Sequence, residues 1–112
     1  MKKLRLSFDR EGLNLPKDDG ERTPAELSSI IIRNMIIGWA TSGQSRGLND
    51  DDRRKYYKIC DAFDAAIKNK AEEVELDDEW MGFIRKAKKD CELIPNELLR
   101  KVEANIEAVK DR

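Results

Sequence analysis

The sequence contains no histidine, only two cysteines, and few aromatic residues, which make up 6% of its 112 positions. Without histidine, the chain by itself can form no Ser-His or Cys-His nucleophilic pair and no His-bound metal site. It also lacks an excess of charge of one sign, because 22 basic and 23 acidic residues leave a net charge of −1. Such a chain has no overall field that would attract nucleic acid or imitate it. These absences favour a non-enzymatic protein that needs no cofactor and no metal.

Apolar and charged residues are both abundant, at 39% and 40% of the chain. A chain of this length forms one domain, here residues 1–112, and buries roughly two-thirds of its unfolded surface. The basic N-terminal segment is not followed by an apolar run long enough for a signal peptide or a membrane span. Cys60 and Cys91 lie in no CxxC motif, so we expect reduced, partly buried thiols. These features indicate a cytoplasmic protein.

Alternating patterns near the N-terminus predict β-structure. Leu4, Leu6 and Phe8 alternate with polar residues, and a second alternating stretch follows a polar turn. We therefore expect a β-hairpin over residues 3–15. Residues 73–76 alternate in the same way and form a possible third strand.

Periodicity and start signals predict four helices. Thr23, Pro24 and Glu26 suit the start of the first helix, because threonine at the N-cap and glutamate three residues later form a capping box. Asp50–Asp52 and Asp77–Glu79 stand where the positive end of a helix dipole favours acids. The expected helices cover about residues 24–41, 50–69, 78–91 and 95–110. The predicted fold class is therefore α+β, with an N-terminal hairpin packed on about four helices.

The first predicted helix is rich in isoleucine, and its apolar residues cover most of its circumference. Its main polar positions are Ser28, Ser29, Arg33 and Asn34. Such a helix either lies at the centre of the core or hides a face against a partner or a second subunit. Ile37 and Trp39 are the candidates for that face. The pattern does not say which face is exposed, and it leaves the oligomeric state open.

Three short motifs have a structural interpretation that outweighs a catalytic one. Gly43–Gly47 matches the G-x-S-x-G elbow of hydrolases, but it follows a helix in a chain without histidine, so we interpret it as a polar loop. The two acidic runs could be imagined as a divalent-metal cluster, but helix-start electrostatics account for them. Both cysteines fall on apolar stripes and are best interpreted as core residues.

Two sets of residues are candidates for partner contacts. Tyr56 and Tyr57 are adjacent, so only one can face the core, and an exposed tyrosine is favoured at interfaces. The set for a protein partner is Trp39, Gln44, Arg46, Tyr56 and Tyr57. The set for a nucleic-acid alternative is Arg85, Lys86, Lys88, Lys89, Arg100 and Lys101. Acids are interleaved with these basic residues, which also fits a solvated helix face.

The order of segments carries a resemblance. The strings that carry it are Asp19-Gly20-Glu21-Arg22-Thr23 before the Ile-rich helix, Tyr56–Phe63, Val74–Glu79 and the break at Leu93-Ile94-Pro95. This layout resembles a loose group of small proteins encoded by tailed bacteriophages and prophages, and it departs from that group around Lys86–Lys89 and in the isoleucine run. The group has no single activity, so no functional residue is carried over.

The resemblance implies a phage or prophage origin and a place in the host bacterial cytoplasm. It also implies non-enzymatic work through a protein partner, either as an inhibitor or modulator of a host or defence machine or as an assembly chaperone. The alternative is a nucleic-acid-binding accessory or regulatory protein that uses the basic stretch.

Overall fold

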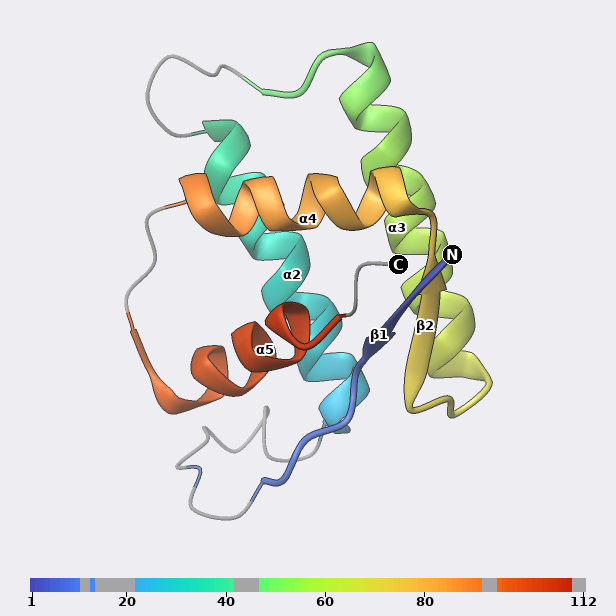
Figure 1. Cartoon of the computed structure of the whole chain (residues 1–112), viewed down its shortest axis with the longest axis vertical. Helices are drawn as coiled ribbons and strands as arrows, with labels where there is room; N and C mark the ends of the chain where they lie inside the picture. The colour runs from blue at the N-terminus through green and yellow to red at the C-terminus, as the bar shows by residue number, and fades with distance from the viewer. Residues whose placement is uncertain (11–12, 14–21, 42–46, 92–94, 110–112) are drawn as a thin grey trace.

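The computed structural model describes residues 1–10, 13, 22–41, 47–91 and 95–109. In these ranges it has two short strands, β1 (Lys2–Arg5) and β2 (Glu73–Leu76), and four helices, α2 (Pro24–Thr41), α3 (Asp50–Lys68), α4 (Asp78–Asp90) and α5 (Glu97–Glu107). The predicted α+β class is confirmed. Helix α2 passes behind α4 and α5, and α3 and the two strands lie beside it (Figure 1).

The first two helices begin at residues whose side chains cap them. Thr23 Oγ1 accepts a hydrogen bond from the Glu26 amide at 3.2 Å, and Glu26 Oε1 accepts one from the Thr23 amide at 3.3 Å. This is the predicted capping box, and α2 has the predicted bounds. Asn49 Oδ1 accepts from the Asp52 amide at 2.8 Å and caps α3 in the same way. Helices α3 and α4 end within one residue of the predicted positions.

Helix α5 is shorter than the predicted span of 95–110. Its N-cap is Asn96, whose Oδ1 accepts a hydrogen bond from the Leu99 amide at 2.7 Å, so Pro95 precedes the helix instead of opening it. Both residues are helix-start signals, and the asparagine, which can satisfy a free amide with its side chain, sets the boundary. The helix ends at Glu107.

Strand β1 pairs antiparallel with β2, far along the sequence, with Leu4 opposite Val74 on the face that is buried. On the exposed face each basic residue of β1 stands opposite an acidic residue of β2; these pairs are Lys3–Glu75 and Arg5–Glu73. Opposite charges directly across two strands stabilise a pair by about 0.2–1 kcal/mol. The segment predicted as a possible third strand is therefore the partner of the first.

The pairing corrects the predicted hairpin over residues 3–15. Directly after β1, the Leu6 amide donates to the Glu72 carbonyl oxygen at 2.8 Å. The Leu6 carbonyl oxygen accepts from Ser28 Oγ at 2.8 Å, and the Ser7 carbonyl oxygen accepts from Asn105 Nδ2 at 3.0 Å. Backbone groups that a hairpin would use are thus bonded to β2, α2 and α5. Of the predicted second arm only residue 13 lies in the described ranges, and it is not in a strand.

The core lies between the sheet and the helices, and every element contributes to it. Fully buried side chains include Leu4, Ile36, Phe63, Leu76, Ile84 and Ile106. Ser28 and Ser29, which the sequence predicts as polar breaks in α2, are also buried, at 1% and 3% exposure. Because Ser28 bonds to a carbonyl oxygen of another segment, its hydroxyl is satisfied inside the core. The exposed side of α2 therefore lies elsewhere on the helix.

Candidate protein-interaction surface

Arg33 of α2 joins this helix to α3. Its Nη2 donates to Asp64 Oδ1 at 2.5 Å and to the Cys60 carbonyl oxygen at 3.3 Å. Its Nε is buried and has no hydrogen-bond partner in the described part of the chain. A guanidinium held by a carboxylate and a carbonyl oxygen is fixed in direction, so the two helices meet in one arrangement at this point.

Two large hydrophobic side chains are exposed on the two helices that the Arg33–Asp64 pair joins, one on each helix. Ile37 follows Arg33 by one turn, about 6 Å along α2, and Tyr57 precedes Asp64 by two turns on the same face of α3. Because the two helices run in opposite directions (Figure 1), both side chains lie beyond the Arg33–Asp64 pair toward the same end of the junction. Ile37 is 48% exposed and Tyr57 60% exposed. We call Arg33, Ile37, Tyr57 and Asp64 the α2–α3 surface.

Of the two adjacent tyrosines, Tyr57 is the exposed one and Tyr56 is half-buried, which agrees with the prediction that only one faces the core. The Tyr56 ring lies 5.9 Å from the Tyr57 ring, centroid to centroid. Burial, together with a hydrogen bond to the Cys60 side chain, raises the pKa of Tyr56 above its usual value of 10.0. The half-buried Tyr56 ring thus lies next to the exposed Tyr57 ring.

Trp39, another predicted contact residue, is half-buried between α2 and α4. Its ring meets Phe83 edge-to-face at a centroid distance of 5.3 Å, and Lys86 Nζ lies 5.5 Å from the ring centre. The adjacent Gly38 allows α2 to lie close to Cys91 at the end of α4, because a Cβ at position 38 would lie 2.9 Å from Cys91 Sγ. The predicted contact residues Gln44 and Arg46 lie outside the described residues.

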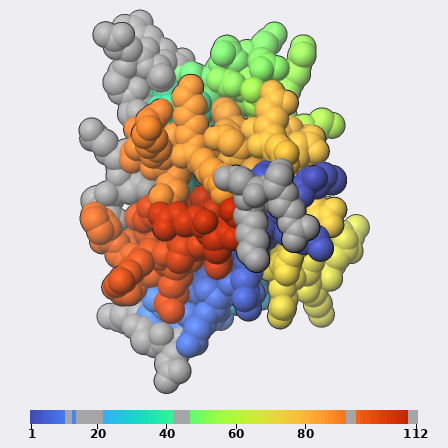
Figure 2. Space-filling model, viewed as in Figure 1, coloured from blue at the N-terminus to red at the C-terminus, as the bar shows by residue number. Residues whose placement is uncertain are grey.

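The predicted basic stretch of α4 is joined to α5, the helix beside it in Figure 2. Lys88 Nζ lies 3.0 Å from Glu107 Oε1 and 3.5 Å from Glu103 Oε2. A hydrogen bond with Glu107 is the main cause that raises the pKa of Lys88 above 10.5. This lysine is therefore engaged within the fold.

Two other members of the predicted nucleic-acid set also have acceptors in the protein. Arg85 Nη2 donates to the Val109 carbonyl oxygen at 2.7 Å, and Arg100 Nη1 lies 3.8 Å from Glu97 Oε1. The remaining members are Lys86, Lys89 and Lys101. A phosphate backbone would have to compete with these internal acceptors for half of the set.

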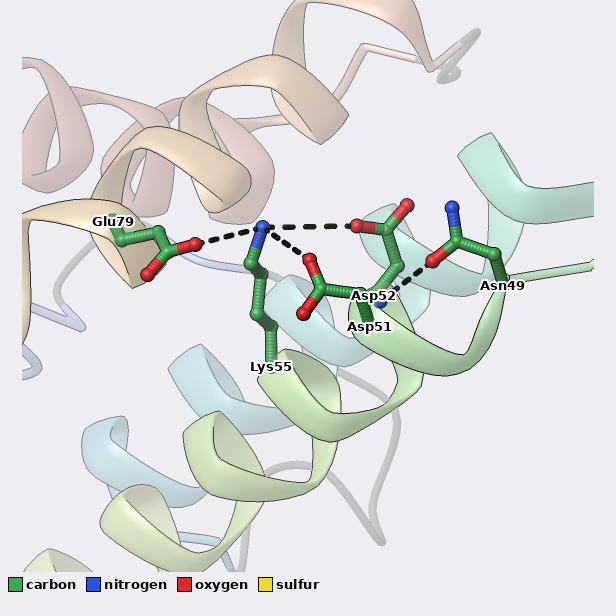
Figure 3. Close-up of polar contacts among 5 residues, drawn as sticks. All are labelled: Asn49, Asp51, Asp52, Lys55 and Glu79. Atoms are coloured by element: carbon green, nitrogen blue, oxygen red, sulfur yellow. Dashed lines mark hydrogen bonds and ion pairs between the residues drawn. The ribbon is translucent and has the colours of Figure 1, made fainter.

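Both predicted acidic helix starts meet at Lys55 (Figure 3). Its Nζ lies 3.0 Å from Glu79 Oε1, 3.3 Å from Asp51 Oδ2 and 3.9 Å from Asp52 Oδ1. Hydrogen bonds with Glu79 and then Asp51 raise the pKa of Lys55 above 10.5. The ammonium group of Lys55 therefore lies between the carboxylates that could, from the sequence, have formed a divalent-metal cluster. Among the described residues no group of three or more Cys, Asp or Glu is placed to hold a metal ion.

These lysine contacts predict a loss of stability at alkaline pH. A lysine whose pKa is raised on folding contributes stability below 10.5, and that stability is lost as the pH rises through the raised pKa. Urea unfolding between about pH 9 and 12 is expected to show a stability that falls with pH. In Lys88→Met the fall is expected to be smaller, because this contact is absent. The difference is expected to be at most about 1 kcal/mol, because Lys88 is partly exposed and its partner Glu107 is largely exposed. Equal alkaline slopes for Lys88→Met and the wild type would contradict this role.

An open hollow of about 600 Å³ lies where α2 begins and α3 ends. Its lining includes Ile67, Ala71 and the side chains of Thr23 and Glu26. Thr23 Oγ1 donates to Glu26 Oε1 at 3.1 Å, so these two polar groups already serve the helix start. Within the lining, Thr23 and Glu26 therefore stabilise the start of α2.

No helix in the described ranges combines the length and the apolar character needed to cross a bilayer. In comparisons with protein-family models, curated proteins and solved structures, no match to this chain was found. The function is therefore inferred from the chain's own surface.

Proposed function

We propose that this chain is a non-enzymatic protein of phage or prophage origin that binds another protein through the α2–α3 surface. The observation that supports the proposal is the exposure of Ile37 and Tyr57 beside the Arg33–Asp64 pair. An aromatic and an aliphatic side chain on two helices fixed to each other are typical of the anchors that dominate interface energies. The phage or prophage origin rests on the resemblance in segment order.

Binding through this surface would act by occlusion or by escorting the partner. The Arg33 contacts hold α2 and α3 before a partner arrives, so little conformational entropy is lost on binding. In the bacterial host cytoplasm, such a protein would cover a functional face of a host or defence machine, or it would shield a virion component during assembly.

The proposal predicts that Ile37→Ser with Tyr57→Ser weakens binding and leaves the fold intact. The wild-type chain is immobilised, the protein that it captures from the host lysate is identified and purified, and its Kd is measured against each variant. Losing anchors worth about 2 kcal/mol is expected to raise the Kd about 30-fold. Tyr57 is mostly exposed and Ile37 about half exposed, so the unfolding midpoint is expected to stay near the wild-type value.

The control variant is Lys89→Ser with Arg100→Ser, which removes two exposed cations of the nucleic-acid alternative. Its Kd is expected to remain within about twofold of the wild type. If both variants bind the captured protein as the wild type does, the α2–α3 surface is not the binding site. Light scattering over a range of concentrations tests whether a second copy of the chain binds to this surface. A wild-type dimer that dissociates in Ile37→Ser with Tyr57→Ser would show that the surface binds a second copy and not a different protein.

A further inference from the structure

Two cations stand directly beside Tyr57 on the exposed side of α3. Arg54 and Lys58 are both exposed, and four residues separate them, so they are neighbours on the helix surface. Neither forms an ion pair within the part of the chain that the structure describes, whereas Arg53 pairs with Asp50 on the same helix. The exposed ring is thus flanked by two cations that form no ion pair with any residue in the described ranges.

This placement leaves an electrostatic repulsion in the free protein. Like charges four residues apart on a helix repel each other and disfavour it. Acids lie about one turn beyond each cation on the same helix, Asp50 and Asp51 before Arg54 and Asp61 after Lys58. Asp50 is bonded to Arg53 and Asp51 to Lys55, and Asp64 further along is bonded to Arg33. Along α3 the two exposed cations therefore enclose Tyr57, and acids that are mostly engaged in other ion pairs lie beyond them on both sides.

We propose that the protein partner presents an apolar anchor to Ile37 and Tyr57, with acidic residues beside that anchor facing Arg54 and Lys58. The inference rests on the proposed function, and it adds the chemistry of the bound segment. Acidic side chains there remove the repulsion between the two cations, so their charge contributes to binding more than it would beside an already paired arginine.

The same features disfavour a nucleic acid as the occupant. Tyr57 offers one ring on which a base could stack, but Ile37, the other exposed side chain, offers none and packs well against an apolar anchor. Asp61 and Asp64 would repel the evenly spaced phosphates of a strand that runs along α3. A protein segment can place its acids only beside the apolar anchor, where Arg54 and Lys58 lie.

Selection from a displayed random-peptide library tests the inference. Peptides are selected on the immobilised wild-type chain after depletion on Ile37→Ser with Tyr57→Ser. We expect the selected peptides to share an aromatic or branched apolar residue with aspartate or glutamate beside it. Arg54→Glu with Lys58→Glu is expected to weaken a selected peptide at least about tenfold, and the same peptide with its acids changed to lysine should then bind that variant better than the wild type.

Lys68→Glu with Lys89→Glu is the matched control, because it changes the net charge equally at exposed positions away from Tyr57. The inference is overturned if selected peptides carry no acids, or if the two charge-reversal variants weaken binding equally. In either case peptides that still depend on Ile37 and Tyr57 would leave the proposed function standing. If no selected peptide depends on those two residues, the proposed function fails as well.

A fluorescent single-stranded oligonucleotide is the competing probe at the same salt concentration. We expect that any binding of this probe is the same for the wild type and for Arg54→Glu with Lys58→Glu. Binding that is lost there, and that falls steeply as salt is added, would assign the two cations to nucleic acid and overturn the protein-segment inference.

Discussion

Replacing Phe63 by alanine is expected to lower the free energy of unfolding by about 3–5 kcal/mol. Phe63 lies on α3 with none of its side chain exposed, in a core to which every helix and both strands contribute. Its removal loses both the transfer free energy of a large ring and the contacts across the cavity that remains. Since a domain of this size has only about 5–15 kcal/mol of stability, the variant is expected to be marginal. Urea unfolding followed by tryptophan fluorescence measures the change.

Tyr57→Ala is the matched control, because it removes an aromatic ring from the exposed side of the same helix. Its free energy of unfolding is expected to stay within about 0.5 kcal/mol of the wild type. If Phe63→Ala does not fold, Phe63→Leu, which keeps much of the volume, is expected to cost about 1 kcal/mol and can be measured instead. A large loss in Tyr57→Ala would make Tyr57 a structural residue and remove the ground for an interface role.

The helix boundaries could be predicted because their signals are local. The capping box of Thr23 and Glu26 involves residues only three positions apart, and the Asn49 cap of α3 does the same. At the start of α5 two such signals are adjacent, Pro95 and Asn96, and local reasoning alone does not rank them. The side-chain hydrogen bond of Asn96 decides the boundary in the structure.

The strand pairing could not be predicted in this way, because it depends on distant segments. Alternation identifies β1 as a half-buried strand but carries no information about its partner. The charges of Glu73 and Glu75 complement those of β1 only once the two strands are aligned. The burial of Ser28 could not be predicted for the same reason. A serine in a helix is expected to be exposed unless its hydroxyl has an acceptor, and here the acceptor is the Leu6 carbonyl oxygen of a distant segment.

The candidate surface was only partly visible in the sequence. Adjacency of Tyr56 and Tyr57 predicts that one is exposed, and the stripe shared with Ile59 and Phe63 places Tyr56 inward. Ile37 is a candidate for an outer face together with Trp39, but the pattern does not decide between faces, because apolar residues surround α2. The cross-helix contact between Arg33 and Asp64, which fixes the surface, involves positions that no spacing rule connects.

Replacing both Ser28 and Asn105 by alanine is expected to lower the free energy of unfolding by about 2–4 kcal/mol. Each substitution leaves a backbone carbonyl oxygen, of Leu6 or of Ser7, without its side-chain donor. The Ser28 site is buried, so water cannot replace the lost hydroxyl there without entering the core. The two acceptors are adjacent along the chain, so the two losses are expected to be coupled instead of simply additive.

The location of the damage distinguishes this explanation from a general loss of packing. If Ser28 and Asn105 hold the chain where it leaves β1, hydrogen exchange of the Leu6 amide, which bonds to Glu72, should accelerate more than exchange in the middle of α3. Asn34→Ala, an exposed polar change on the same helix as Ser28, is expected to leave both stability and exchange within error of the wild type. A stability loss below about 1 kcal/mol in the double variant would mean that the hydrogen bonds do not determine the path after β1, and that the β1–β2 pairing is sustained by the strands and the core alone.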